Sequence, residues 1–146
     1  MDAREFGIAR IYGFVFGITY LGVALTEVLL GANGWRADGN VILEATPVQN
    51  AVHWLVGATV LVSALIGETV ARMVARVIGI VFVVLTVWGF IDRDSLGTVL
   101  GFDGPLPWSY NIVHLITAIA ALFAGFAASR AYGRETSGGS DLRHAA

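Results

Sequence analysis

Long apolar runs separated by short polar segments dominate the chain, and the length of these runs predicts its secondary structure. A helix needs about 20 residues to cross a bilayer. The third run reaches that length only if Arg72 and Arg76, at its start, extend toward the headgroups. Lipid cannot bond to exposed backbone groups, and the runs lack the alternation of barrel strands, so we predict four transmembrane helices. The runs cover approximately residues 11–30, 45–66, 77–91 and 109–129.

Composition supports a membrane protein and excludes several other classes. Hydrophobic residues make up 56% of the 146 residues and charged residues only 14%, so the lipid bilayer is the expected solvent. The net charge of -2 gives no indication of a nucleic-acid partner. The chain contains no cysteine, which excludes disulfides, thiolate nucleophiles, iron–sulfur clusters and thiolate zinc sites.

The distribution of arginine predicts the orientation. Arginine supplies all nine basic residues, and with four spans only Arg36 and Arg93 fall on one side of the membrane. The other seven lie on the opposite side, which should be cytoplasmic under the positive-inside rule. We therefore expect a multi-pass plasma-membrane protein with its N-terminus and C-terminus in the cytoplasm.

Two motifs recur in the same order along the chain. Arg10-x-x-Gly13 in the first run returns as Arg76-x-x-Gly79 in the third, 66 residues later (76 − 10). The second and fourth runs likewise share an Asn-x-Val-His motif, which occupies residues 50–53 and 111–114, displaced by 61 residues (111 − 50). Such recurrence indicates an internal duplication.

The duplication predicts an all-α fold built from two tandem helical hairpins. Repeat 1 covers about residues 4–67 and repeat 2 about residues 70–130, and each contributes two spans, so the repeats are parallel. We expect one transmembrane domain, residues 1–130, forming an up-down-up-down four-helix bundle. The polar, Gly/Ser-rich residues 131–146 are typical of a flexible cytoplasmic tail.

Small residues spaced four apart should form the seams between these helices, because helices in lipid gain contact only by close approach. Examples are Gly13 and Gly17 in the first run and Ala75 and Gly79 in the third. We expect the seams to be internal. A homo-oligomer that uses one of them is the alternative.

His53 and His114 are the principal candidate site residues. Both lie four to six residues inside the outer ends of their helices, about 6–9 Å below the boundary. In a structural interpretation, Asn50 and Asn111 complete the helix starts, and the histidines tie the outer loops to the bundle. We also interpret Arg10 and Arg76 as structural polar residues. They lie at the opposite membrane boundary.

A b-type haem is the alternative interpretation of the histidine pair. Helices two and four are diagonal in the predicted bundle, so His53 and His114 could both project toward its axis as axial ligands. Electron transfer would be the function. A metal or proton site in a small transporter is a further alternative, with His53, His114, Glu27 and Asp92 as its members.

The four spans, the paired Asn-x-Val-His helices and the Arg-Gly helix starts resemble an uncharacterised actinobacterial family of four-helix integral membrane proteins, a domain of unknown function. The resemblance covers about residues 6–130 and implies the fold and the membrane location only. From the residues themselves we expect a protein that is not an enzyme. Its expected role is an accessory or complex-forming membrane subunit with a membrane-protein partner.

Overall fold

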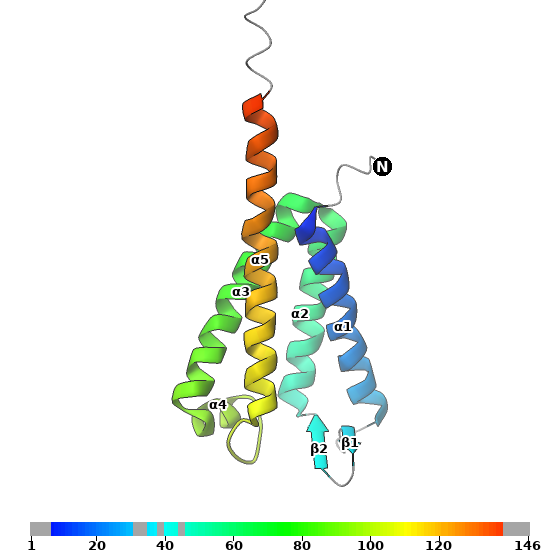
Figure 1. Ribbon diagram of the computed structural model, residues 1–146. Helices are drawn as coiled ribbons and strands as arrows, with labels where there is room; N and C mark the ends of the chain where they lie inside the picture. Colours follow the sequence, from blue (N-terminus) through cyan, green and yellow to red (C-terminus); the bar gives the residue numbers. More distant parts are fainter. Residues whose placement is uncertain (1–6, 31–34, 38–39, 44–45, 139–146) are drawn as a thin grey trace, which may run out of the picture.

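The computed structural model describes residues 7–30, 35–37, 40–43 and 46–138. Four long helices run through it: α1 (Ile8–Leu30), α2 (Pro47–Ile66), α3 (Glu68–Ile91) and α5 (Trp108–Gly138) (Figure 1). All four contain a segment long and apolar enough to cross a membrane, which confirms the predicted spans. The short elements are β1 (Trp35–Ala37), β2 (Asn40–Leu43) and α4 (Arg93–Val99).

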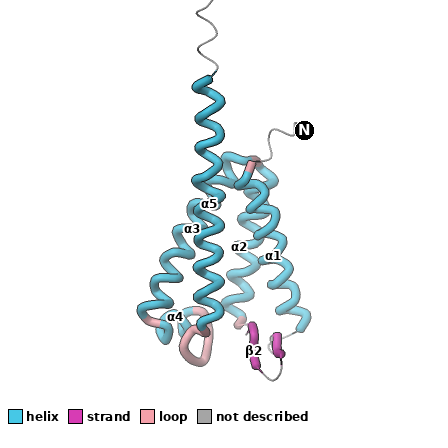
Figure 2. The backbone as a smooth tube through the Cα atoms, in the orientation of Figure 1, coloured by secondary structure: helices cyan, strands magenta, loops and turns pink. Residues whose placement is uncertain are grey.

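The helices form two antiparallel hairpins that pack against each other. The closest pairs are α1 with α2 and α3 with α5. Helix α1 also contacts α3 and α5, and α2 contacts α3. The β1–β2 hairpin and α4 lie at one end of the bundle, whereas the start of α1 and the α2–α3 turn lie at the other (Figures 1 and 2).

Local signals in the sequence account for the bounds of α2. The Thr46 hydroxyl accepts a hydrogen bond from the Gln49 backbone N–H, and Pro47 occupies the first turn, where it costs no helical hydrogen bond. At the other end, Gly67 has φ +151°, a backbone conformation that side chains disfavour. Glycine therefore makes the abrupt turn into α3 possible.

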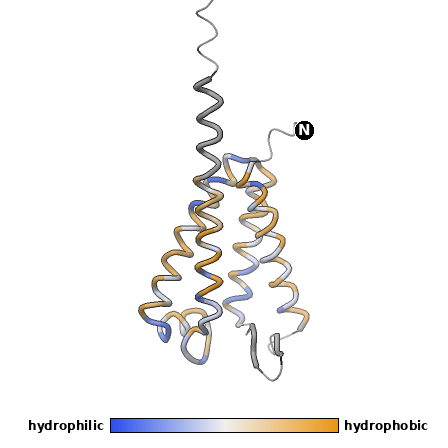
Figure 3. Tube along the Cα trace, in the orientation of Figure 1, coloured by the Kyte–Doolittle hydropathy of each residue, from blue (hydrophilic) through white to orange (hydrophobic). Residues whose placement is uncertain are grey.

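The outward-facing surfaces of the long helices are apolar. Large exposed hydrophobic side chains occur on all four, including Ile18, Leu55, Val84 and Ile116. Hydropathy colouring shows that hydrophobic residues recur along the whole length of these helices (Figure 3). A surface of this kind is stable only in lipid, so the protein is a multi-pass membrane protein.

Glycine allows the helices of each hairpin to approach closely. A Cβ atom on Gly13 would lie 2.7 Å from Ala64 Cβ, and one on Gly79 would lie 2.6 Å from a Leu122 methyl carbon. Both distances are too short for real carbon atoms. These glycines therefore lie in the α1–α2 and α3–α5 seams inside the molecule, as expected of small residues in membrane helices.

The two hairpins share a hydrogen bond at corresponding positions. Arg10 Nε donates to the Ala64 carbonyl at 2.8 Å, and Arg76 Nε donates to the Gly125 carbonyl at 2.9 Å. The donors are 66 residues apart and the acceptors 61 apart (125 − 64), the displacements of the two sequence motifs. This shared contact supports aligning the two hairpins residue by residue.

Helix α4 and the loop after it cover the end of the second hairpin that lies opposite the α2–α3 turn (Figure 1). The Asp92 carboxylate caps α4 by accepting from the Ser95 N–H at 3.0 Å. Behind this cap, five buried side chains form a hydrophobic cluster against α5: Leu96, Leu100, Phe102, Leu106 and Tyr110. This cluster therefore covers the polar start of α5.

The structure differs from the prediction at the C-terminal end. Helix α5 continues to Gly138, past residue 131, where we placed the start of a flexible tail. Its membrane-spanning segment ends at Phe126. Residues 139–146, which include His144, lie outside the described residues.

Candidate functional site

The first hairpin holds a polar cluster of three side chains near the end of α1 and the start of α2. Glu27, in the last turn of α1, has only 5% of its side chain exposed. Its carboxylate accepts from Asn50 Nδ2 at 2.9 Å and lies 3.1 Å from His53 Nδ1. Asn50 and His53 lie one turn apart on α2, so both reach the same carboxylate.

Asn50 also ties α2 to the backbone of α1. Its Nδ2 atom donates to the Ala24 carbonyl at 2.9 Å. We predicted that Asn50 would complete the start of its own helix, but Thr46 performs that role. The cluster of Glu27, Asn50 and His53 therefore clamps two helices together and leaves no member unpaired.

The corresponding residues of the second hairpin lack partners. Asn111 is fully buried and His114 is 8% exposed. Neither Asn111 Nδ2, Asn111 Oδ1 nor His114 Nδ1 has a hydrogen-bond partner among the described residues. A buried polar atom without a partner costs about 1–3 kcal/mol. Asn111 lies against Gly89 of α3, where even a methyl group would collide with its amide.

A series of aromatic contacts runs from one histidine to the other. The rings of His53 and Tyr20 have centroids 5.5 Å apart, and those of Tyr20 and Phe82 are 6.3 Å apart. Phe82 then meets His114 edge-to-face at 5.5 Å. The two histidines thus face the bundle interior at a similar depth, but Tyr20 and Phe82 fill the space that links them.

Tyr20 has a role that no motif in the sequence indicates. Its hydroxyl lies 2.9 Å from the Thr117 hydroxyl across the α1–α5 interface, and the pair is buried. Thr117 stands one turn after His114 on α5. The spacing of Thr117 from the histidine was visible in the sequence, but nothing marked Tyr20 as its partner.

The haem interpretation requires a porphyrin between the two imidazoles. Tyr20 and Phe82 contribute to a core cluster at that level, together with Val56 and Ala118. Gly89, which would leave space beside a porphyrin, is covered by Asn111. A haem held by both histidines would therefore have to displace packed side chains, and this arrangement does not fit it.

The structure separates the four members of the alternative metal or proton site. It brings Glu27 and His53 together, whereas the Asp92 carboxylate is exposed and caps α4. Within the described part of the chain, no group of three or more His, Cys, Asp and Glu side chains could hold a metal ion.

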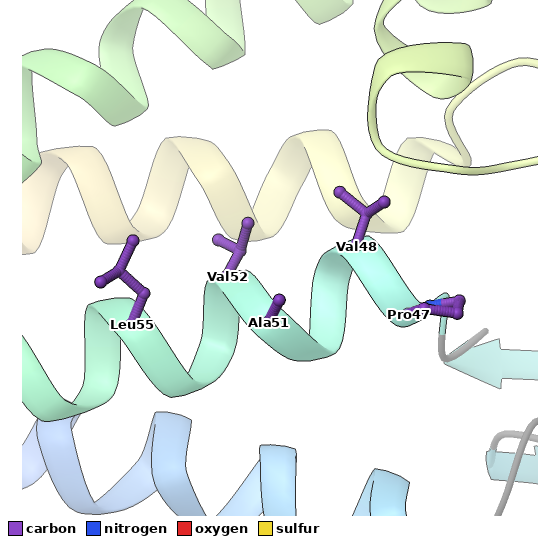
Figure 4. A pocket seen from close by; sticks show the side chains of 5 residues that line it. All are labelled: Pro47, Val48, Ala51, Val52 and Leu55. Carbon is purple, nitrogen blue, oxygen red and sulfur yellow. The ribbon is translucent and has the colours of Figure 1, made fainter.

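A shallow cleft on α2 lies beside this region. Five residues line it: Pro47, Val48, Ala51, Val52 and Leu55. Figure 4 shows Val48, Val52 and Leu55 on the side of α2 where α5 passes. The cleft measures about 420 Å³ and its lining is almost wholly apolar. Such a lining offers dispersion contacts but no group for acid–base or metal chemistry.

A second polar contact lies beside the α2–α3 turn and joins Glu68 to Arg72, four residues later on α3. The two side chains lie 3.6 Å apart. The Glu68 carboxylate also accepts from the backbone N–H groups of Ala9 and Arg10, at 3.3 and 3.0 Å. It thereby caps α1 from another helix, a role that spacing along one helix could not indicate.

A family model described as a domain of unknown function, DUF4383, matches residues 36–127. The chain belongs to the DUF4383 family. The match includes α2, α3 and the membrane-spanning part of α5, and with them His53 and His114. No curated protein and no solved structure matches the chain. DUF4383 membership thus accompanies a four-helix membrane fold without assigning an activity to it.

Proposed function

We propose that the protein is a non-catalytic accessory subunit of a complex in the plasma membrane, with both termini in the cytoplasm. The observation that carries this proposal is the filling of the bundle interior by side chains. Tyr12, Val60, Ala75 and Ala121 form one core cluster, which draws on all four spanning helices. A carrier or an enzyme needs a cavity that substrate can reach. Dense packing instead suits a scaffold that presents its outer surface to other proteins.

The polar residues of the first hairpin support the same proposal. Glu27, Asn50 and His53 satisfy one another and join α1 to α2. Buried polar groups in membrane helices often mark function, but a fully paired set is also a means of fixing helix orientation. Their geometry favours a structural role.

Native mass spectrometry of the tagged full-length protein, extracted from its own membranes in mild detergent, tests the accessory role. We expect a discrete species that contains this chain and a second polypeptide in fixed stoichiometry. A tag-matched membrane protein of similar size serves as the control. A species containing this chain alone, together with solute transport by the pure protein in liposomes, would contradict the proposal.

An absorption spectrum tests the haem alternative at the same time. We expect no Soret band from the purified protein. If haem is bound through the two helical histidines, a Soret band will be present and will disappear in His53→Ala and His114→Ala. It will persist in His144→Ala, the matched control at a histidine that lies outside the described residues. That pattern would replace the accessory role with electron transfer.

A further inference from the structure

The two hairpins contain the same pair of hydrogen-bond donors, but only one pair is occupied. In the first hairpin, Asn50 Nδ2 and His53 Nδ1 both contact the carboxylate of Glu27. In the second, the equivalent atoms are Asn111 Nδ2 and His114 Nδ1, which are buried and have no partner among the described residues. The first hairpin therefore serves as a template for what the second lacks.

In the first hairpin, the partner of these two donors is a carboxylate, that of Glu27. The 66-residue displacement between α1 and α3 aligns Glu27 with Arg93 (27 + 66). The second hairpin thus carries a cation where the first carries an acid. Asp92, the neighbouring acid, does not replace Glu27, because its exposed carboxylate caps α4.

The surroundings of Asn111 and His114 favour an anion. Arg93 Nε donates to the Leu106 carbonyl at 2.8 Å, just before α5 begins, and its guanidinium carbon lies 4.3 Å from the centre of the Trp108 ring. Asn111 lies in the first turn of α5, where the helix dipole and the free N–H groups favour negative charge. The Arg93 side chain therefore lies at the same end of α5 as the helix start and the unpaired donors of Asn111 and His114.

We propose that Asn111 and His114 bind the carboxylate of a small organic acid anion in the second hairpin. The bound carboxylate would occupy the position that Glu27 has in the first hairpin, with one oxygen on Asn111 Nδ2 and another on His114 Nδ1. A carboxylate is an acceptor of two hydrogen bonds in one plane, which matches two donors spaced one helical turn apart.

The size of the site limits the ligand. Asn111 is fully buried, and the side chains of α4 and its following loop close the outer end above it. The Tyr20–Thr117 contact closes the inner side, one turn below His114. An anion bound beneath this cap would therefore have to be small, of about the size of formate or acetate.

Thermal unfolding of the full-length protein in detergent, followed by tryptophan fluorescence, provides the first test. Sodium formate or acetate should raise the midpoint by about 3 °C, with saturation, relative to sodium chloride at equal ionic strength. Asn111→Leu should abolish the rise. Asn50→Leu, the same change in the first hairpin, should lower the midpoint but retain the rise.

Asn111→Asp is a second variant that conserves shape. Because it replaces the Nδ2 donor with a carboxylate that would repel a second anion, it should no longer respond to formate. Solid-state NMR adds a direct readout, in which ¹³C-formate should show a dipolar contact to the ¹⁵N-labelled His114 ring. The proposal is overturned if the native protein shows no carboxylate-specific rise, or if both Asn111 variants retain it.

Discussion

At the scale of single residues, the same motif has two different fates in one chain. His53 and His114 follow an asparagine by three residues and face the interior of the bundle from α2 and α5. His53 is held by Glu27, whereas His114 Nδ1 has no partner among the described residues. Glu27 lies in the last turn of α1, whereas the residue aligned with it in the second hairpin is Arg93, at the start of α4.

The clamp formed by Glu27 predicts a strong coupling between residues. Glu27→Leu should destabilise the protein by about 2–4 kcal/mol, because it removes the partner of His53 Nδ1 and one of the two acceptors of Asn50 Nδ2, at partly buried positions. The double variant Glu27→Leu/His53→Leu should lose less than the sum of the two single changes. Unfolding titrations of the four proteins in mixed micelles measure this coupling. Strict additivity would show that the two side chains do not interact.

The capping role of Glu68 gives a second prediction at this scale. Glu68→Ala should cost about 1–2 kcal/mol, because two N–H groups at the start of α1 lose their acceptor. Hydrogen exchange at Ala9 and Arg10 should accelerate. Arg72→Ala is the matched control, since it breaks only a partly exposed ion pair worth at most about 1 kcal/mol. Equal effects of the two changes would contradict the capping role.

At the scale of elements, the hydrophobic pattern located the helices well, because lipid leaves no alternative to a helix in runs of this length. Helices α3 and α5 extend well beyond their apolar runs: α3 starts at Glu68, since its arginines lie at the boundary, and α5 continues to Gly138. The contacts between helices could be predicted less well from the sequence. Spacing on α2 placed Asn50 beside His53, but that both meet Glu27 depends on how α1 packs. Tyr20–Thr117 likewise exists only after folding.

The seam glycines provide a prediction about elements. Gly13→Ala should destabilise the α1–α2 hairpin by about 1–3 kcal/mol, because the new methyl group would lie 2.8 Å from the Val60 carbonyl oxygen. Gly22→Ala, on the same helix, has no atom within 4 Å of the added carbon. It should be neutral or stabilising by up to about 1 kcal/mol, through helix propensity. Thermal midpoints of the two variants in one detergent compare them directly.

At the scale of the whole molecule, fold and orientation rest on different evidence. The apolar outer surface identifies lipid as the solvent, and the four spans place both ends of the described chain at one end of the bundle (Figure 1). Which side of the membrane that end faces is a prediction from arginine alone. Arg10, Arg72 and Arg76 belong to it, whereas Arg93 belongs to the opposite end.

The absence of cysteine from the sequence makes this orientation directly testable, because a single introduced thiol is the only one present. Gly104 and Thr69 are both exposed, on the outer loop and near the α2–α3 turn respectively. A membrane-impermeant thiol reagent should label Gly104→Cys in intact cells, and Thr69→Cys only after permeabilisation. The positive-inside rule requires this order, because Thr69 lies beside the arginine-rich end. Labelling of Thr69→Cys in intact cells would reverse the orientation and place the Asn111–His114 site toward the cytoplasm.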